Sequence, residues 1–130
     1  MEQLKQLLEV IIAMNKNETS VSKQEKIDDY YKEVINKRVI IRSYESGVHY
    51  GTLQSVHDNT VTLTNSRRIH YWDGANSLTD IALGGIQNKV ESRVTASLDS
   101  IIVKNVNEII PCTALAIDCL DNFPIWSLVK

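Results

Sequence analysis

The hydrophobic positions in the first part of the chain recur at helical spacing. Between residues 2 and 15, leucine, isoleucine and methionine return every three or four positions, which predicts an amphipathic helix. Residues 17–20 interrupt this pattern, and Ser22 with Glu25 then forms the S-x-x-E capping box that starts many helices. Neither helix would be stable alone, so we expect a helical hairpin that acts as an anchor or oligomerisation arm over residues 1–36.

From residue 37 onward the hydrophobic period changes to two. This alternation predicts strands in "RVIIRSYE", "VHYGTLQSV", "TVTLTNSRRIHYW", "RVTASLD" and "SIIVKNVNEII". The segment "GANSLTDIALGG" predicts a short helix that stops at its glycine pair, and Thr113 is placed to cap another helix that runs to Leu120. The sequence therefore predicts an α+β fold, with a compact antiparallel β core over residues 37–130 and one or two short helices.

Composition narrows the class of protein. A chain of 130 residues fits one domain with an appended arm. No apolar stretch approaches the roughly 18 residues that a membrane span needs, and the N-terminus lacks the basic start of a signal peptide. Cys112 and Cys119 match no zinc or redox spacing, which favours reduced cysteines in a cytosolic protein.

The positions of the arginines indicate a candidate anion-binding site. All five lie in the predicted β core, and the planar guanidinium suits phosphate and carboxylate groups. Arg67 shares its alternation phase with Val61 and Ile69, so a regular strand would place it on the apolar face. An unpaired guanidinium is costly there. Either a bulge near Asn65 and Ser66 redirects Arg67, or a negative group occupies that face.

A second arginine breaks the pattern in the same way. Arg42 shares a strand face with Ile40 and Tyr44, and two interpretations remain open for it and for Arg67. The two arginines could form a desolvated phosphate site, or they could pair with carboxylates of this chain. The carboxylates considered for such pairs are Glu45, Asp73, Asp80 and Glu91.

No recognisable catalytic signature is present. His49, His57 and His70 fit neither H-E-x-x-H nor a Cys/His zinc spacing, and the chain has no nucleophile elbow, Walker loop or G-x-G-x-x-G. We therefore expect no enzyme activity, metal or cofactor. A small β-barrel that binds RNA is an alternative, but the net charge of −2 and the absence of an RNP motif favour a pocket with few cations.

Several segments resemble a known family. "RVIIRSYESGVHYGTL", "SRRIHYWDGANSLTDIAL", "EIIPC" and "PIW" are similar to the pattern V-R-x-x-x-x-G-V-x-x-G-x-L followed by R-[IL]-x-x-W-x-G-A-x-[ST]-L. This pattern is typical of small phage and prophage proteins of the first class of Thoeris anti-defence proteins, the phage sponges. The resemblance extends from Lys37 to Trp126.

The resemblance implies a binding function without catalysis. Such sponges bind the cyclic ADP-ribose isomers made by bacterial TIR-domain proteins, and so keep these signals from the defence effector in the cytoplasm of the infected host. Some members also hold cyclic trinucleotides at a separate site. The implied fold is a helical anchor with a fin-like β core, and the implied assembly is a homo-oligomer, a dimer that associates into hexamers, with pockets at subunit interfaces.

The resemblance also implies which residues bind the ligand. Cyclic ADP-ribose carries a doubly charged pyrophosphate, two riboses and an adenine, so it requires cations and ring-stacking partners. The arginines and the amide implied by the matching motifs are Arg42, Arg67, Arg68, Asn76 and Arg93, and the aromatic candidates are Tyr50, Tyr71 and Trp72. Some family members have an aromatic residue where Arg67 stands. From the residues alone, an RNA-binding barrel or a phage interaction module remains the alternative.

Overall fold

The computed structural model describes residues 30–127, and the chain divides into two units, Met1–Glu33 and Val34–Lys130. Most of the predicted helical hairpin lies outside the described residues. Tyr30 and Tyr31 are helical, but residues 32–36 form turns, so the predicted helix does not continue through Val34 and Ile35.

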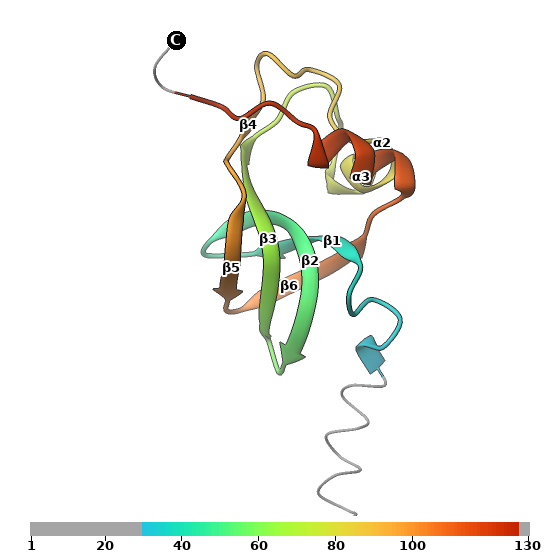
Figure 1. Ribbon diagram of the computed structural model, residues 1–130, viewed down its shortest axis with the longest axis vertical. Coiled ribbons are helices and arrows are strands. Elements are labelled where there is room, and N and C mark those ends of the chain that lie inside the picture. Colours follow the sequence, from blue (N-terminus) through green and yellow to red (C-terminus); the bar gives the residue numbers. More distant parts are fainter. Residues whose placement is uncertain (1–29, 128–130) are drawn as a thin grey trace, which may run out of the picture. The chain divides into compact units, whose positions relative to one another are not determined.

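One antiparallel sheet forms the body of the second unit (Figure 1). Its strands are β1 (Arg38–Ser43), β2 (Gly47–His57), β3 (Thr60–Tyr71), β4 (Arg93–Val94), β5 (Leu98–Val103) and β6 (Val106–Pro111). The strand order is β4-β3-β2-β1-β6, and β5 also pairs with β3. The long strand β3 therefore pairs with β5 near its start and with β4 near its end. The predicted α+β class with an antiparallel sheet is confirmed.

Two strand predictions were wrong in detail. In "RVTASLD" only Arg93 and Val94 form β4, and the final residues belong to the start of β5. The stretch "SIIVKNVNEII" is not one strand, because Asn105 has a φ of 56° between β5 and β6. Asparagine adopts this left-handed conformation more readily than most residues, and it ends the extended run.

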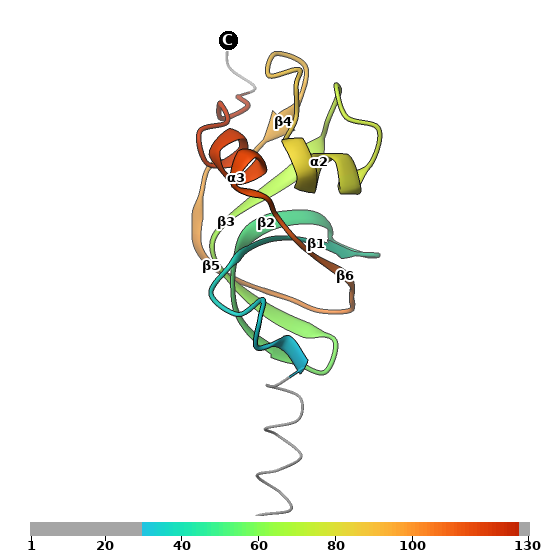
Figure 2. The same cartoon turned by 90° about the vertical axis from the view of Figure 1, so that its right-hand side faces the viewer.

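The two short helices form where the sequence predicts them. Helix α2 (Leu78–Gly84) begins after Ser77, whose hydroxyl accepts the Asp80 backbone N–H. Helix α3 (Ala114–Asp121) begins after Thr113, whose hydroxyl accepts from the backbone of Ala116. Both are N-caps that satisfy otherwise unpaired backbone donors. The helices lie side by side against one side of the sheet (Figures 1 and 2).

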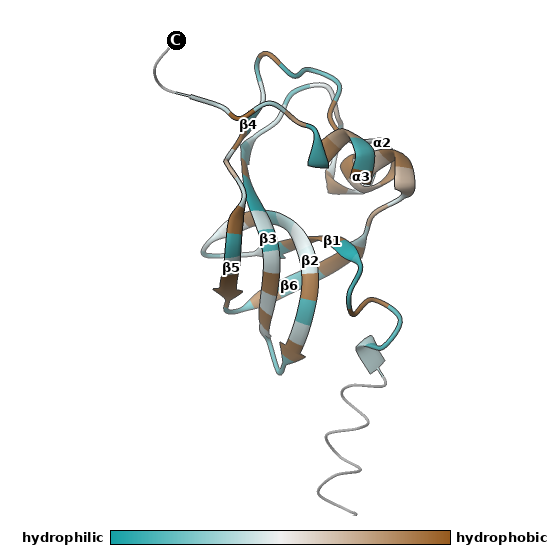
Figure 3. Cartoon of the chain, viewed as in Figure 1, coloured by the Kyte–Doolittle hydropathy of each residue, from teal (hydrophilic) through white to brown (hydrophobic). Residues whose placement is uncertain are grey.

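The sheet buries side chains on both faces. The helix-side core lies under α2 and α3 and includes Ile40, Tyr50 and Ile69. The inner core lies within the curl of the sheet and includes Ile41 and Leu63 (Figure 2). Hydrophobic and hydrophilic residues alternate along much of β2 and β3 because successive side chains point to opposite faces (Figure 3).

A β-bulge reverses this alternation in the middle of β3. Tyr50 pairs with Arg67 but Thr52 pairs with Thr64, so Gly51 alone faces two residues, Asn65 and Ser66. Asn65 has a φ of 47°. A Cβ atom on Gly51 would lie 3.1 Å from the backbone oxygen of Thr64 and 3.2 Å from the Ser66 Cα. A glycine opposite the bulge therefore permits this close approach.

The bulge determines which way the adjacent arginines point. Before it, Val61 and Leu63 belong to the inner core. After it, Ile69, with the same odd numbering, belongs to the helix-side core. Arg67 lies on the same face of the sheet as Ile69, toward the helix-side core. Arg68 faces the opposite side of the sheet. The bulge considered in the sequence analysis is therefore confirmed, although Arg67 is still only 5% exposed.

Helix α3 is attached to the sheet by a network of three side chains, those of Arg38, Tyr50 and Asp121. The Tyr50 hydroxyl donates to Asp121 Oδ1 at 2.7 Å, and Arg38 Nη2 donates to the same oxygen at 2.7 Å. The Arg38 guanidinium also lies over the Tyr50 ring, 4.2 Å from its centroid, a favourable cation–π arrangement. These contacts join β1 and β2 to the last residue of α3.

Removing the shared acceptor of this network tests its role in stability. We expect Asp121→Ala to lower the free energy of unfolding by roughly 2–3 kcal/mol, because Arg38 and the Tyr50 hydroxyl lose their charged partner. Tyr50→Phe, which removes only one hydrogen bond, should cost about 1–2 kcal/mol. Urea unfolding measures both. Asp118→Ala on the same helix is the matched control, and an equal loss in Asp118→Ala and Asp121→Ala would contradict this interpretation.

Candidate functional site

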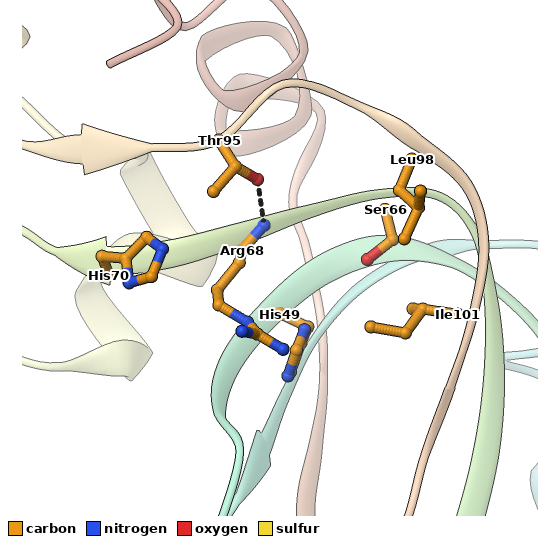
Figure 4. A pocket seen from close by; sticks show the side chains of 7 residues that line it. All are labelled: His49, Ser66, Arg68, His70, Thr95, Leu98 and Ile101. Carbon is orange, nitrogen blue, oxygen red and sulfur yellow. Dashed lines mark hydrogen bonds between the residues drawn. The ribbon is translucent and has the colours of Figure 1, made fainter. Parts of the chain in front are cut away.

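A pocket of about 240 Å³ opens between β2, β3 and the segment that leads into β5 (Figure 4). We call it the His49–Arg68 pocket. Its lining residues are His49, Ser66, Arg68, His70, Thr95, Leu98 and Ile101. Arg68 and His49 are directly opposite each other in the β2–β3 register. The pocket thus combines a cation and two imidazoles with the apolar side chains of β5, a mixture that suits a small ligand.

Arg68 has no anionic partner within the described part of the chain. Its backbone N–H donates to Thr95 Oγ1 at 2.9 Å, which fixes the strand beside the pocket. Its side chain extends toward the His49 ring (Figure 4), and no carboxylate of residues 30–127 lies within 4.0 Å of the guanidinium. A half-buried guanidinium without a counter-ion favours binding of an anion.

His49 is a buried residue in the wall of the pocket, and it is neutral at pH 7. Its ring is 1% exposed, and burial, aided by the positive charge of Arg68, lowers the pKa of His49 from 6.5 to about 4. The Nε2 atom forms a 3.3 Å hydrogen bond with the Ser46 hydroxyl. The Nδ1 atom is buried and has no hydrogen-bond partner among the described residues. This unsatisfied nitrogen was not predicted from the sequence.

A second cluster joins Arg93 to two aromatic rings, and we call it the Arg93–aromatic cluster. The Arg93 guanidinium carbon lies 4.8 Å from the centroid of Trp126 and 5.9 Å from that of Tyr71. Tyr71 and Arg93 are register partners in β3 and β4. The backbone N–H of Trp126 donates to the carbonyl of Val94 at 2.9 Å. No described carboxylate lies within 4.0 Å of Arg93.

The His49–Arg68 pocket and the Arg93–aromatic cluster contain neighbouring residues of the same segments. His70 lines the pocket and Tyr71, the next residue of β3, belongs to the Arg93–aromatic cluster. Thr95 lines the pocket two residues after Arg93. Trp126 was not among the site residues predicted from the sequence, although it lies in the "PIW" segment that carries part of the resemblance. Its proximity to Arg93 depends on how the C-terminal segment folds back, which no local pattern indicates.

Two predicted ligand residues lie in the interior instead. Tyr50 is 1% exposed and is hydrogen-bonded to Asp121; burial and Asp121 raise the pKa of its hydroxyl. Arg67 donates from Nε to Thr95 O at 2.7 Å and from Nη1 to Leu120 O at 2.8 Å. Burial lowers the pKa of Arg67, yet an arginine stays charged near neutral pH. Both side chains contact protein groups, and neither lines the His49–Arg68 pocket.

None of the ion pairs considered for Arg42 and Arg67 forms within the described residues. Arg42 is exposed and lies 3.8 Å from Glu108, its neighbour in the β1–β6 register, so it does not sit on a buried face. Arg67 is held by backbone carbonyls rather than by a carboxylate ion pair. Neither residue pairs with any of the four carboxylates considered, Glu45, Asp73, Asp80 and Glu91.

The remaining candidates lie after the end of β3. Trp72 is half-buried against the helix-side core, which is a packing role. Asn76 is exposed and lines a separate, polar pocket of about 410 Å³ with Asp73 and Asp80. The structure therefore brings Arg68 and His49 into one pocket and Arg93, Tyr71 and Trp126 into one cluster, whereas Asn76 belongs to a different pocket.

The described residues include possible metal ligands and thiols, for which a metal site and a nucleophile set specific requirements. No group of three or more His, Cys, Asp or Glu side chains in residues 30–127 is arranged to hold a metal ion. Cys112 and Cys119 are free thiols, and burial raises the pKa of Cys112 to about 11, which makes it a poor nucleophile. Within the same residues, no helix has the length and apolar character needed to cross a membrane.

Comparison with known families gives one match. The family model described as "Domain of unknown function (DUF6948)" matches residues 36–120, and the chain belongs to this family. The matched region runs from just before β1 to the penultimate residue of α3, so it includes the whole His49–Arg68 pocket and Arg93 but not Trp126. No curated protein matches the sequence.

The buried neutral imidazole predicts a loss of stability in acid. The unfolded chain protonates His49 below pH 6.5, whereas the folded protein does so only near pH 4. The free energy of unfolding should therefore fall by roughly 3 kcal/mol through His49 as the pH drops across that interval. Urea unfolding at several pH values measures this fall. In His49→Phe the decrease should be smaller by that amount, and an unchanged pH profile would contradict the assignment.

Proposed function

We propose that this protein binds cyclic ADP-ribose-type nucleotides and sequesters them without cleaving them. The observation that carries this proposal is a pair of guanidinium groups, on Arg68 and Arg93, that no described carboxylate neutralises. Arg68 lies in a pocket and Arg93 lies beside two aromatic rings. A pyrophosphate attached to a purine and two riboses offers the two charges and the ring that such groups would bind.

The size of the pocket indicates what part of the ligand it could hold. Its volume of about 240 Å³ is below the roughly 300–1,000 Å³ that encloses a drug-sized ligand. One pocket would therefore hold a fragment, such as a phosphoryl group with part of a ribose. The rest of the nucleotide would extend toward the Arg93–aromatic cluster or toward a second copy of the chain.

The biological setting of the proposal follows from the resemblance to phage anti-Thoeris sponges. In this setting the ligand is a cyclic ADP-ribose isomer made by a TIR-domain protein of the Thoeris system, captured in the cytoplasm of an infected bacterium. The protein would act as a homo-oligomer, a dimer or a hexamer built as a trimer of dimers, with pockets completed at subunit interfaces. Cyclic trinucleotides are a further ligand class under the same proposal.

Arginine variants test the proposed ligand contacts. We expect Arg68→Ala and Arg93→Ala each to weaken the binding of cyclic ADP-ribose isomers about 10- to 100-fold in isothermal titration calorimetry. This range corresponds to the roughly 1.5–3 kcal/mol of a hydrogen bond to a charged group. Lysine at either position should restore only part of the affinity, because the planar fork is lost.

The same variants distinguish binding from stability. Neither guanidinium has an ion-pair partner in residues 30–127, so the melting temperature should change little in Arg68→Ala. In Arg93→Ala it should fall only as far as the loss of the contacts with Tyr71 and Trp126 requires, about 0.5–1 kcal/mol of stability each. Arg42→Ala is a comparison in which the existing pair with Glu108 predicts a smaller loss of affinity, and Lys104→Ala, on the exposed β5–β6 turn, is the control. Full affinity in both Arg68→Ala and Arg93→Ala would refute the proposed site.

The RNA-binding alternative predicts a different result. A single-stranded RNA track requires many phosphate contacts, so its affinity falls steeply as salt increases. Fluorescence anisotropy with short labelled RNA at several salt concentrations measures this dependence. We expect weak RNA binding next to tight cyclic-nucleotide binding, and the reverse order would favour an RNA-binding module.

A further inference from the structure

His49 is the buried polar group of the pocket that the fold leaves unsatisfied. Its ring lines the pocket and is 1% exposed, and its Nδ1 atom has no partner among the described residues. An unpaired buried nitrogen costs free energy comparable to a lost hydrogen bond. The opposite nitrogen is already bonded to Ser46. A ligand in the pocket would therefore change the free-energy cost of this unpaired nitrogen. The ring that carries it is held in place by the hydrogen bond to Ser46.

The groups around His49 set the charge of its ring in the free protein. Burial is the main factor that disfavours a positive charge on it, and Arg68 and His70 from β3 add to this effect. The residue opposite it on β1 is Ile41, and β5 contributes the apolar side chains Leu98 and Ile101 to the pocket. No acidic side chain lines the pocket. The imidazole is thus neutral because it is buried, because Arg68 repels a proton on it, and because the pocket offers no acidic side chain to stabilise a charge.

An anion in this pocket would favour the charged form of the His49 ring. A phosphoryl group next to Arg68 would neutralise the guanidinium that repels a proton on His49, and its oxygen atoms would accept a hydrogen bond from a charged imidazolium. We propose that the His49–Arg68 pocket is a phosphoryl-binding subsite in which His49 takes up a proton as the anion binds. This proposal deepens the proposed function, since the anion would be one phosphoryl group of the sequestered nucleotide.

Proton uptake makes anion affinity depend on pH. The dependence applies between two pKa values of His49, about 4 in the free protein and a higher value in the complex. Within this interval one proton binds with the ligand, so Kd falls about tenfold for each unit by which the pH decreases. Affinity must rise toward acid, because protons are taken up when the anion binds. A pocket in which Arg68 alone bound the anion would show no such dependence from His49.

Sulfate is the appropriate probe, because it resembles a phosphoryl group and stays fully ionised across the range tested. The experiment titrates the full-length protein with sulfate between pH 4 and 8, a range that reaches the His49 pKa of the free protein, and follows the imidazole nitrogens of His49 by NMR. We expect saturating sulfate to raise the pKa of His49 by at least about one unit and to tighten binding toward acid. Sulfate binding that leaves the His49 titration unchanged would overturn the proposal, and so would the absence of sulfate binding.

Variants assign the pH dependence to one ring. His49→Phe keeps an aromatic ring without nitrogens, and in a His70→Gln background, which removes the other imidazole of the pocket, it should abolish the pH dependence of sulfate affinity. His57→Gln is the matched control, since His57 is exposed at the far end of β2, next to Asp58, and it should retain that dependence. If His49→Phe does not fold, the NMR titration of the unmodified protein still decides. A pH dependence of unchanged size in the folded double variant, His49→Phe with His70→Gln, would overturn the proposal.

The same titration separates this inference from the proposed function. Tight binding of cyclic ADP-ribose with no change at His49 would overturn the subsite and leave the function intact. Sulfate binding coupled to His49, without affinity for any cyclic ADP-ribose isomer, would support the subsite and contradict the function.

Discussion

The close approach of β2 to the bulged part of β3 is the constraint on which the site depends. Gly51 faces both Asn65 and Ser66, and Asn65 adopts the left-handed conformation that makes room for the additional residue. Without this bulge, Arg68 would share a strand face with the helix-side core. With it, Arg68 faces His49 across the β2–β3 pair. The extra residue therefore decides that Arg67, and not Arg68, faces the helix-side core, and that Arg68 lines the His49–Arg68 pocket.

The two adjacent arginines illustrate how environment decides role. Arg67 gives its hydrogen bonds to the carbonyls of Thr95 and Leu120, and so ties β3 to the end of α3 and to the segment after β4. Arg68 is in the same strand and has the same chemistry, but it has no acceptor of that kind for its guanidinium among the described residues. Arg38 and Asp121 complete the attachment of α3. The chain then continues to Trp126, whose ring lies against Arg93.

Local patterns predicted the elements of this fold better than they predicted its contacts. The caps at Ser77 and Thr113 and the bulge near Asn65 depend on neighbouring residues, so the sequence contains their signals. The split of one predicted strand into β5 and β6 depends on a single asparagine conformation. Periodicity alone cannot reveal it.

The candidate site was predicted only in part, for a related reason. Arg68 and Arg93 were identified by residue type and by the resemblance. The pairing of Arg42 with Glu108, and of Tyr50 with Asp121, joins residues far apart in the chain. Their partners are fixed by strand order and by the return of α3 to the sheet, which depend on the whole fold. The unsatisfied nitrogen of His49 likewise becomes visible only once β3 lies opposite it.

The central claim is capture of a cyclic nucleotide without chemical change, and recovery of the bound molecule tests it most directly. The protein would be incubated with the products of an active TIR-domain protein, separated from free ligand and denatured by heat, and the released material would be identified by mass spectrometry. The account predicts an intact cyclic ADP-ribose isomer with the mass and retention time of the input. Recovery of linear ADP-ribose or another cleavage product, or of no nucleotide at all, would contradict it.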